Sequence, residues 1–459
     1  MLPSCLTVHH SIVSEQAQHT ESVTPIFIAA EIKTLNQTHL TFYIANISLN
    51  MKLTPFALIT ALVSSTVNAA PLPDKIRGAN LGGWLLLEPW ITPSIFEQFR
   101  GMPNAAVDEY TFCANLQKQE AYRQLKEHWE SWVTEEDIGK LSNYGLNTIR
   151  IPYGYWMVDV NDDEPYVQGQ YPYLRRAVSW AIEHNLHVLL DLHGAPGSQN
   201  GFDNSGRAGN INWPKDPENI RRTVNVLANV TAEFQPEVAN GDVSIQFLNE
   251  PFGIPGTEVT LDLLKDFYSQ SYAAIHKAAN LDYKPVTVGH DGFSFYNELG
   301  EFLNSMKNTI LDTHIYQVFD ENLLKFSPQQ HLDMACGEKG RIASSPVRTI
   351  IGEWSLATTD CTLWLNGFQK GARYDGTHIT TSPVCPGCTC KDEGNVNAFN
   401  GTYRAFLREF AEKQMDAYEG SFGWIFWNFK AENSPQWNYI QGVEEGWIPN
   451  PPTNRISSC

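Results

Sequence analysis

The stretch Val243-Ser244-Ile245-Gln246-Phe247-Leu248-Asn249-Glu250-Pro251 decides the fold, because a strand-like apolar run ends in a carboxylate. Ile350-Ile351-Gly352-Glu353-Trp354 repeats this arrangement further along the chain. Separate strands of one sheet can hold two carboxyl groups roughly 5 Å apart, the spacing that glycosidic hydrolysis with retention requires. Either glutamate alone is more simply explained as the cap of a following helix, but the two together indicate a catalytic pair.

Both motifs belong to a series of eight short apolar runs, with helical patterns between most of them. The runs cover residues 76–85, 146–153, 187–193, 243–248, 285–290, 310–316, 347–354 and 423–429. Helices are expected over 173–185, 216–234, 261–278 and 399–418, and a further helix start at Thr134-Glu135-Glu136-Asp137. Strands that alternate with helices predict a parallel sheet, and eight such units predict an α/β fold, a (β/α)8 TIM barrel with extended loops.

The carboxyl ends of the predicted strands carry side chains of catalytic type. They are Glu88, Arg150, His193, Asn249, Glu250, His314, Tyr316, Glu353 and Trp427. Each alone has an ordinary structural explanation, since a lone histidine is usually a satisfied core residue and a lone arginine a solvated one. Because the active site of such a barrel lies where its strands end, their gathering there is better explained by one site.

The beginning of the chain contains a second start at Met51-Lys52, followed by the apolar run 53–63. This pattern and the small residues around Val67-Asn68-Ala69 indicate a secretory signal with a cleavage site. We therefore expect a signal peptide over 51–69, a single catalytic domain over 70–459, and an upstream stretch, 1–50, that does not belong to the native protein. A signal anchor is the alternative, but the run is short for a span of about 20 residues.

The composition argues against two classes of partner. The chain has 51 acidic and 32 basic residues, a net charge of -19, which repels phosphate backbones and anionic bilayers. Neither nucleic acid nor a membrane is therefore an expected partner. Aromatic residues form 12% of the chain; most are core filler, but some can stack on the C–H faces of uncharged sugars.

Cysteines and sequons fit an oxidising, secretory route. Seven cysteines follow the predicted signal, so at least one is unpaired, and Cys336 and Cys459 are candidates for a disulfide that holds the C-terminal tail. The run Cys385-Pro386-Gly387-Cys388-Thr389-Cys390 admits a metal site as the alternative, but nothing nearby completes four ligands. We expect no metal and no cofactor. Asn229 and Asn400 are candidate glycosylation sites.

Four stretches resemble glycoside hydrolase family 5, and within it the fungal exo-β-1,3-glucanases. The most specific are Asn80-Leu81-Gly82-Gly83-Trp84-Leu85-Leu86-Leu87-Glu88-Pro89-Trp90 and Asp191-Leu192-His193-Gly194-Ala195-Pro196-Gly197-Ser198-Gln199-Asn200-Gly201. The less specific Asn249-Glu250-Pro251 and Gly352-Glu353-Trp354 complete the set. The chain departs from the family at Asn428-Phe429, where a small polar residue and a second tryptophan are common, and in the cysteine-rich region 375–395.

The resemblance implies a role for each candidate residue. Glu250 is then the acid/base and Glu353 the nucleophile, so we expect a raised pKa for the first and a lowered pKa for the second. Arg150 and Tyr316 are expected to contact the nucleophile, and Asn249 the sugar 2-hydroxyl. The remaining residues are expected to bind sugar: His193, His314 and Glu88 through hydroxyls, Trp427 as the floor, and Phe202 with Phe319 as an entrance clamp, although core packing is the alternative for Phe319.

The sequence thus predicts a secreted, retaining exo-β-1,3-glucanase, extracellular or associated with the cell wall. Its expected partner is β-glucan, cleaved to glucose from non-reducing ends with possible transfer to other sugars, by an enzyme that we expect to be a monomer. An endo-acting or β-1,6-preferring relative remains open, because exo action depends on loops that close the pocket. A catalytically inactive wall protein that binds glucan is the alternative outside the enzyme class.

Overall fold

The computed structural model describes residues 72–280, 285–378 and 382–459, all of them within one compact unit, Thr66–Cys459. The predicted signal, 51–69, and the upstream stretch, 1–50, lie outside the described residues.

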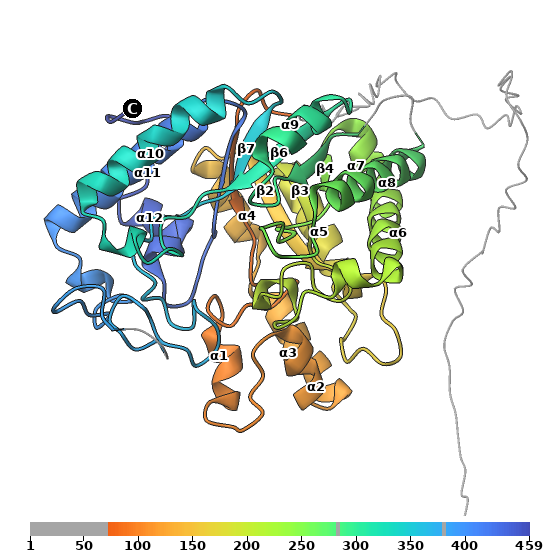
Figure 1. The fold of residues 1–459 in the computed structure, drawn as a ribbon, viewed down its shortest axis with the longest axis horizontal. Helices are drawn as coiled ribbons and strands as arrows, with labels where there is room; N and C mark the ends of the chain where they lie inside the picture. The colour runs from red at the N-terminus through yellow and green to blue at the C-terminus, as the bar shows by residue number, and fades with distance from the viewer. Residues whose placement is uncertain (1–71, 281–284, 379–381) are drawn as a thin grey trace, which may run out of the picture. The chain divides into compact units, whose positions relative to one another are not determined.

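Eight parallel strands of the unit close into a barrel in sequence order (Figure 1). They are β1 (Ile76–Asn80), β2 (Thr148–Gly154), β3 (His187–Gly194), β4 (Val243–Gln246), β5 (Thr287–His290), β6 (Thr309–His314), β7 (Thr349–Glu353) and β8 (Gly423–Phe426). The predicted (β/α)8 barrel is confirmed, and each of the eight apolar runs corresponds to one strand, with β2, β3 and β6 each extending one residue beyond the run.

Helices surround this barrel. They are α1 (Pro93–Phe96), α2 (Glu109–Asn115), α3 (Lys118–Ser131), α4 (Glu135–Asn143), α5 (Tyr171–Glu183), α6 (Pro217–Glu233), α7 (Gln235–Asn240), α8 (Leu261–Ala279), α9 (Tyr296–Asn304), α10 (Pro328–Ala343), α11 (Gly401–Tyr418) and α12 (Tyr439–Glu444). Figure 1 shows α10 beside α11 and α6 beside α8 on the outside of the sheet. Helices α1 to α3 belong to the long segment between β1 and β2, outside the regular repeat.

Four of the five predicted helices, α4, α6, α8 and α11, begin at a side chain that satisfies a free backbone amide. Thr134 and Asp137 form a reciprocal capping box at the start of α4, and Asp216 caps α6 by accepting from the amide of Glu218. Asn400 caps α11 in the same way, by accepting from the amide of Tyr403. The predicted helix boundaries therefore lie within a few residues of the observed ones.

The interior of the barrel has an apolar part and a polar part. Strand side chains that include Ile76, Leu189, Val288, Ile310 and Ile425 form an apolar cluster separate from the larger core. Nearer the carboxyl ends of the strands the buried side chains become polar. Arg150, Gln246 and Asp312 each have no exposed surface. Buried polar groups cost free energy unless they are hydrogen-bonded, so this part of the barrel is built around one network.

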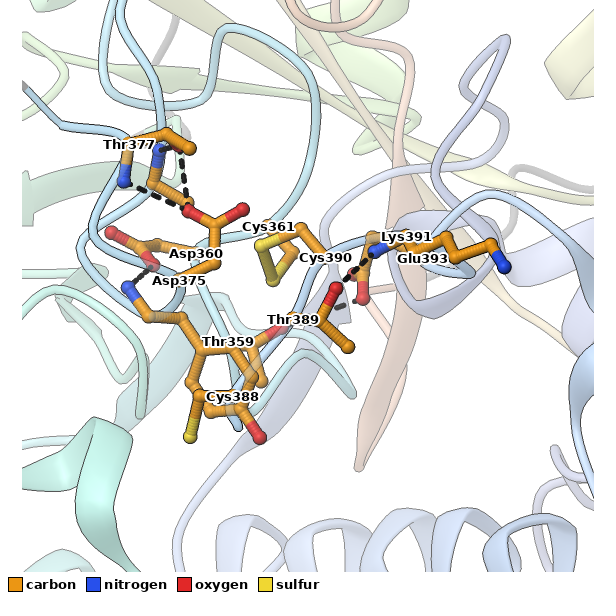
Figure 2. Close-up of a disulfide and its surroundings, with 12 residues drawn as sticks. Thr359, Asp360, Cys361, Asp375, Thr377, Cys388, Thr389, Cys390, Lys391 and Glu393 are labelled. Atoms are coloured by element: carbon orange, nitrogen blue, oxygen red, sulfur yellow. Dashed lines mark hydrogen bonds between the residues drawn. A yellow bond between two sulfur atoms is a disulfide. The ribbon is translucent and has the colours of Figure 1, made fainter. Parts of the chain in front are cut away.

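Three disulfides tie the described chain together. Cys336 on α10 is bonded to Cys459, which fastens the C-terminal tail as the sequence predicted. Cys361 is bonded to Cys390, and Cys385 to Cys388, so the cysteine-rich run forms disulfides. Figure 2 shows the Cys361–Cys390 bond in the long loop between β7 and α11, next to the buried carboxylate of Asp360. Cys113 is left as a buried free thiol.

Two surface features complete the description. Asn229 and Asn400, the candidate glycosylation sites, are both exposed. Among the helices of the described residues, none combines the length and the apolar character that a membrane span requires.

Candidate active site

Glu250 and Glu353 meet above the ends of β4 and β7, around a single nitrogen of His314. The Nδ1 atom of His314 lies 2.7 Å from Oε1 of Glu250 and 3.4 Å from Oε2 of Glu353. These two carboxylate oxygens are therefore at most roughly 6 Å apart, a limit that includes the roughly 5–5.5 Å between the carboxyl groups of retaining glycosidases. Both carboxylates are almost fully buried. The spacing suits a direct attack on a sugar carbon by one of the two.

Arg150 connects Glu353 to the barrel interior. Its guanidinium donates to Oε1 of Glu353 at 2.9 Å, and Tyr316 donates its hydroxyl proton to Oε2 at 2.8 Å. The other donors of Arg150 are all engaged: with Gln246 Oε1, Asn80 Oδ1 and Asn249 Oδ1 at 2.8 Å each, and with Asp191 Oδ2 at 3.1 Å. Five fixed acceptors hold the planar guanidinium in one orientation, so Glu353 is aimed before any substrate arrives.

His314 has a raised pKa, and this reverses one expectation from the sequence. Burial alone would lower the pKa of His314, but the charges of Glu353 and Asp312 and its hydrogen bonds to Asp312 and Glu250 raise it well above the usual value. Burial raises the pKa of Glu250, yet the hydrogen bond and charge of His314 outweigh it and hold that pKa at about 2. Burial raises the pKa of Glu353, Glu250 adds to the shift, and His314 and Arg150 oppose it. We expected the opposite order for the two glutamates, because a histidine bonded to Glu250 is not visible in the linear sequence.

The structure also changes the expected role of His314. Its Nε2 lies 3.2 Å from Asp312 Oδ2, and its Nδ1 is the atom bonded to Glu250. Both ring nitrogens therefore face carboxylates. A sugar hydroxyl bound by His314, as the sequence predicts, would have to share one of these two contacts.

His193, Asn249 and Trp427 form a second group of contacts next to Arg150. His193 Nδ1 donates to Asp191 Oδ2 at 2.6 Å, and the amide nitrogen of Asn249 lies 3.3 Å from His193 Nε2. The ring of Trp427 is stacked on that of His193, with centroids 5.4 Å apart. Asn428, where the chain departs from the family pattern, accepts from the Gly82 amide and donates to the Gly82 carbonyl, which anchors the segment behind Trp427.

A cavity of about 630 Å³ opens in front of the two carboxylates. Glu88 lines it from the loop after β1 and Asp203 from the loop after β3. One oxygen of Glu88 accepts from Trp90 Nε1, whereas its Oε1 and Oδ2 of Asp203 are buried without a partner. Burial raises both pKa values, that of Asp203 to about 7. Buried acceptors without partners are positions where ligand hydroxyl groups would be bound.

The aromatic rim of this cavity includes both predicted clamp residues. Phe202 is 40% exposed and Phe319 is 48% exposed, so both are surface side chains and Phe319 is not core filler. Phe319 packs against Tyr316, with ring centroids 5.4 Å apart. Flat rings at the entrance give an apolar, sugar-compatible lining at the point where a chain would enter.

Several residues at this site were not identified from the sequence. Asn204 donates to Oε2 of Glu250 at 3.1 Å, and Trp437 lines the cavity beside Tyr316. Asp191 lies in the same stretch as His193, so the sequence contains a signal for it. Asn204, Trp437, Gln246 and Asp312 carry no motif of their own and are recognised only through what they contact.

Glu250, His290 and His314 are close enough, within 4.8 Å, to consider a shared metal ion. His290 argues against this. Its Nδ1 accepts from the Gly292 amide at 3.0 Å, so the Nε2 atom carries the proton and offers no lone pair. The two histidines therefore act as hydrogen-bonding groups.

Paired carboxylates at the carboxyl end of a closed (β/α)8 barrel, inside a polar and aromatic pocket, define a glycoside hydrolase. Residues 110–369 match the family described as Cellulase (glycosyl hydrolase family 5). The chain is 42% identical to a "Glucan 1,3-beta-glucosidase" of Blumeria graminis, over 87% of this chain and 96% of that protein. This chain belongs to glycosyl hydrolase family 5.

Two other relatives agree with this assignment, and one solved structure agrees with the fold. A "Probable glucan 1,3-beta-glucosidase A" of Emericella nidulans is 41% identical and a "Glucan 1,3-beta-glucosidase" of Kluyveromyces lactis is 39% identical, each over 87% of this chain and 96% of the relative. The structure of a rutinosidase from Aspergillus niger superposes with a TM-score of 0.64, covering 83% of this chain and 99% of that one. At 18% sequence identity this likeness supports the fold alone.

Proposed function

We propose that the protein is a retaining exo-β-1,3-glucanase that releases glucose from the non-reducing ends of β-1,3-glucan. The names of the relatives support the substrate. The observation that carries the chemistry is the contact of Glu250 and Glu353 with the same nitrogen of His314, because it holds two buried carboxylates at a spacing suited to double displacement.

In this proposal Glu353 is the nucleophile. It attacks the anomeric carbon, while the proton in the contact between His314 and Glu250 passes through Glu250 to the departing glycosidic oxygen. Glu250 then takes a proton from the water that hydrolyses the glycosyl–enzyme bond. The hydrogen bonds from Arg150 and Tyr316 orient Glu353 for the attack. Transfer of the glycosyl group to a second sugar instead of water would follow the same route.

The remaining side chains bind the sugar in front of the cleaved bond. Asn249 is proposed to contact the 2-hydroxyl, with His193 bonding a neighbouring hydroxyl and Trp427 forming the floor. The unpartnered oxygens of Glu88 and Asp203 would accept hydrogen bonds from the hydroxyls at the far end of the same sugar. Phe202 and Phe319 would hold the next glucose unit at the entrance.

Exo action is favoured over endo action by the loop between β7 and α11. Leu365, Phe368 and Arg373 of this loop line the cavity. Arg373 bonds to the buried Asp360 at 2.8 Å and to the Phe319 carbonyl at 2.9 Å, which fixes the loop to the rim. A fixed wall formed by this loop, together with the unpartnered oxygens of Glu88 and Asp203, suits binding of the end of a glucan chain. It suits less well a glucan chain that extends through the site in both directions. An endo-acting or β-1,6-preferring enzyme remains the second candidate.

We further propose that the enzyme is secreted after removal of residues 51–69, carries glycans at Asn229 and Asn400, and acts as a monomeric single domain over 70–459. The signal-like segment, the sequons and the disulfides support this route. The net charge of -19 supports a role without nucleic acid or anionic membrane as partners.

The experiment that tests the proposed function is the product profile of laminarin, followed by NMR of the anomeric protons, with protein expressed from Ala70 onward. Glucose as the only product, released first as the β anomer, is the expected result. Oligosaccharide products would show an endo-acting enzyme. Binding of laminarin by calorimetry without any product would show an inactive glucan-binding protein.

A further inference from the structure

Asp312 of β6 is a fully buried carboxylate to which the proposed mechanism gives no part. Its Oδ1 accepts from the Gly352 amide at 2.8 Å, one residue before Glu353. Its Oδ2 accepts from Gln246 Nε2 at 2.8 Å and from His314 Nε2 at 3.2 Å. One carboxylate thus contacts the strand that carries Glu353 and the histidine that contacts Glu250.

The glycine at position 352 leaves space for the carboxylate of Asp312. A Cβ atom at position 352 would collide with both carboxylate oxygens of Asp312, so glycine is the residue that allows the approach. Gln246 is also fixed, because its Oε1 accepts from Arg150 Nε and only its amide nitrogen is left for Asp312. Gln246, Arg150, Glu353, His314 and Asp312 therefore form a continuous chain of hydrogen bonds and ion contacts beneath the cavity.

The contact with Asp312 determines which nitrogen of His314 holds a permanent proton. A carboxylate is only an acceptor, so Nε2 of His314 is protonated. The second proton of the pair must then lie in the 2.7 Å contact between Nδ1 and Oε1 of Glu250. It rests either on the histidine, as a cation beside a carboxylate, or on Glu250, as an acid beside a neutral imidazole.

We propose that Asp312 is a positioning residue that fixes the Nε2–H form of His314 and so keeps a transferable proton between His314 and Glu250. This inference rests on the proposed function. In the first step the proton moves from the contact between His314 and Glu250 to the glycosidic oxygen. The electron pair of the broken C–O bond goes to the same oxygen. His314 keeps its Nε2 proton and is left neutral. In the second step the attacking water returns one proton to the same contact.

The groups around His314 are consistent with this role. Glu250, Glu353 and Asp312 face it with negative charge, and their effect raises its pKa. His290, whose ring centroid is 4.5 Å away, has a lowered pKa because of burial and the charge of His314. Arg150 acts on Asp312 and Glu353 and contacts neither ring nitrogen of His314. Asp291 is bonded to Thr313 Oγ1 and to the Phe293 amide, and lies 3.6 Å from His290.

Asp312→Asn tests the proposal. The asparagine oxygen can still accept from the Gly352 amide. The asparagine NH2 group, which can only donate, then faces two other donors, Gln246 Nε2 and His314 Nε2. His314 would therefore lose its Nε2 proton, keep a proton on Nδ1, and leave Glu250 unable to act as an acid. We expect kcat/KM for phenyl β-glucoside to fall about 100-fold, and that for 2,4-dinitrophenyl β-glucoside less than about 5-fold, since its leaving group needs no proton.

Asp291→Asn is the matched control, because Asp291 is a buried aspartate at the end of β5 with no contact to His314, Glu250 or Glu353. It should not change the ratio of the two rates. Equal losses on both substrates in Asp312→Asn, or the same selective loss in Asp291→Asn, would overturn the proposal. A wild-type protein that hydrolyses neither glucoside nor laminarin would instead refute the proposed function itself.

A second measurement does not depend on the folding of a variant. Nitrogen-15 NMR of histidine-labelled wild-type enzyme, with His314 assigned through His314→Gln, reports the protonation of each ring nitrogen. We expect Nε2 of His314 to stay protonated throughout the pH range of activity. A neutral His314 with its only proton on Nδ1 would contradict the inference whatever the variants show.

Discussion

At the scale of single residues, the site depends on groups that are oriented before the substrate binds. Glu353 accepts from Arg150 and Tyr316, and neither donor can turn away, because Arg150 has four other acceptors and Tyr316 is packed against Phe319 and Trp437. Preorganised donors of this kind lose little freedom during the reaction, which is where their catalytic benefit lies.

Glu353→Gln removes the attacking oxygen and leaves a side chain of the same shape. We expect kcat on a dinitrophenyl glucoside to fall at least roughly a thousandfold, with the fold unchanged by circular dichroism, because no covalent intermediate can form. A variant that keeps more than a few per cent of the wild-type rate would show that Glu353 is not the nucleophile.

Arg150→Lys keeps the charge but removes the planar array of donors. Lysine has three protons for the five acceptors of Arg150, so buried oxygens would be left unpaired. We expect a loss of about 2–5 kcal/mol in the free energy of unfolding and at least about 100-fold in kcat/KM, measured by urea denaturation and aryl glucoside hydrolysis.

Arg221→Lys is the control for this substitution, because Arg221 pairs with Glu218 on the surface of α6. Its stability and activity should stay close to those of the wild type. If Arg150→Lys behaved like Arg221→Lys, the fixed guanidinium would have no part in catalysis or folding.

The residue scale also shows what a sequence can reveal about a site. Glu250 and Glu353 were identified because each ends an apolar run, and Phe202 because its loop setting indicated exposure. The pKa order of the two glutamates was predicted wrongly, since it depends on His314, which is 64 positions from Glu250 in sequence but 2.7 Å away in space. Asp312 was missed for the same reason: its importance follows from contacts with β4 and β7, not from its neighbours in the chain.

At the scale of elements, regular alternation was predictable and insertions were not. Every strand coincides with a predicted run to within one residue at each end it oversteps, because burial on both faces makes parallel strands continuously apolar. Helices α2 and α3 lie in the segment between β1 and β2, which the eightfold repeat does not require. Helix α3 buries only Ala121, Leu125, His128 and Trp129, a single face of an otherwise polar segment.

The disulfides of the loop between β7 and α11 provide a test at this scale. Cys361–Cys390 closes a separation of 29 residues and holds the segment next to Asp360, whereas Cys385–Cys388 closes a separation of 3. Chain-entropy arguments give the longer loop about 3–4 kcal/mol of stabilisation and the shorter one clearly less.

We therefore expect the Cys361→Ser/Cys390→Ser double variant to lose several degrees in Tm and to have a higher KM for laminarin, because the wall that carries Arg373 loosens. The Cys385→Ser/Cys388→Ser double variant is the matched control and should change both quantities less. Equal effects in the two variants, measured by calorimetry and steady-state kinetics, would show that the longer disulfide does not hold the cavity wall.

At the scale of the whole molecule, buried neutral histidines link stability to pH. His187, at the start of β3, is 2% exposed; its Nδ1 faces the Gly241 carbonyl and its Nε2 the Ser244 hydroxyl. Burial lowers the pKa of His187 to about 4, from an ordinary value of 6.5. Burial lowers the pKa of His128 to about 4 as well.

The sign of the effect follows from which state binds the proton. Between pH 6.5 and pH 4 the imidazole of His187 is protonated in the unfolded chain and neutral in the folded one, so the free energy of unfolding falls as the pH falls through this window. Below pH 4 both states are protonated and the effect levels off. One such histidine accounts for about 3 kcal/mol over the whole window.

His187→Gln keeps a polar side chain at the same place but cannot take up this proton. Its free energy of unfolding, measured by urea denaturation from pH 7 to pH 4, should therefore fall less than that of the wild type, by up to about 3 kcal/mol. His184→Gln, at a partly exposed position at the end of α5, controls for the loss of an imidazole and should follow the wild-type curve. If the His187→Gln curve ran parallel to that of the wild type, His187 would have the same pKa in the folded and the unfolded chain. The acid sensitivity of the molecule would then have to come from other groups, such as His128 or Glu419, whose pKa Arg455 and Arg77 hold at about 2 against the effect of burial.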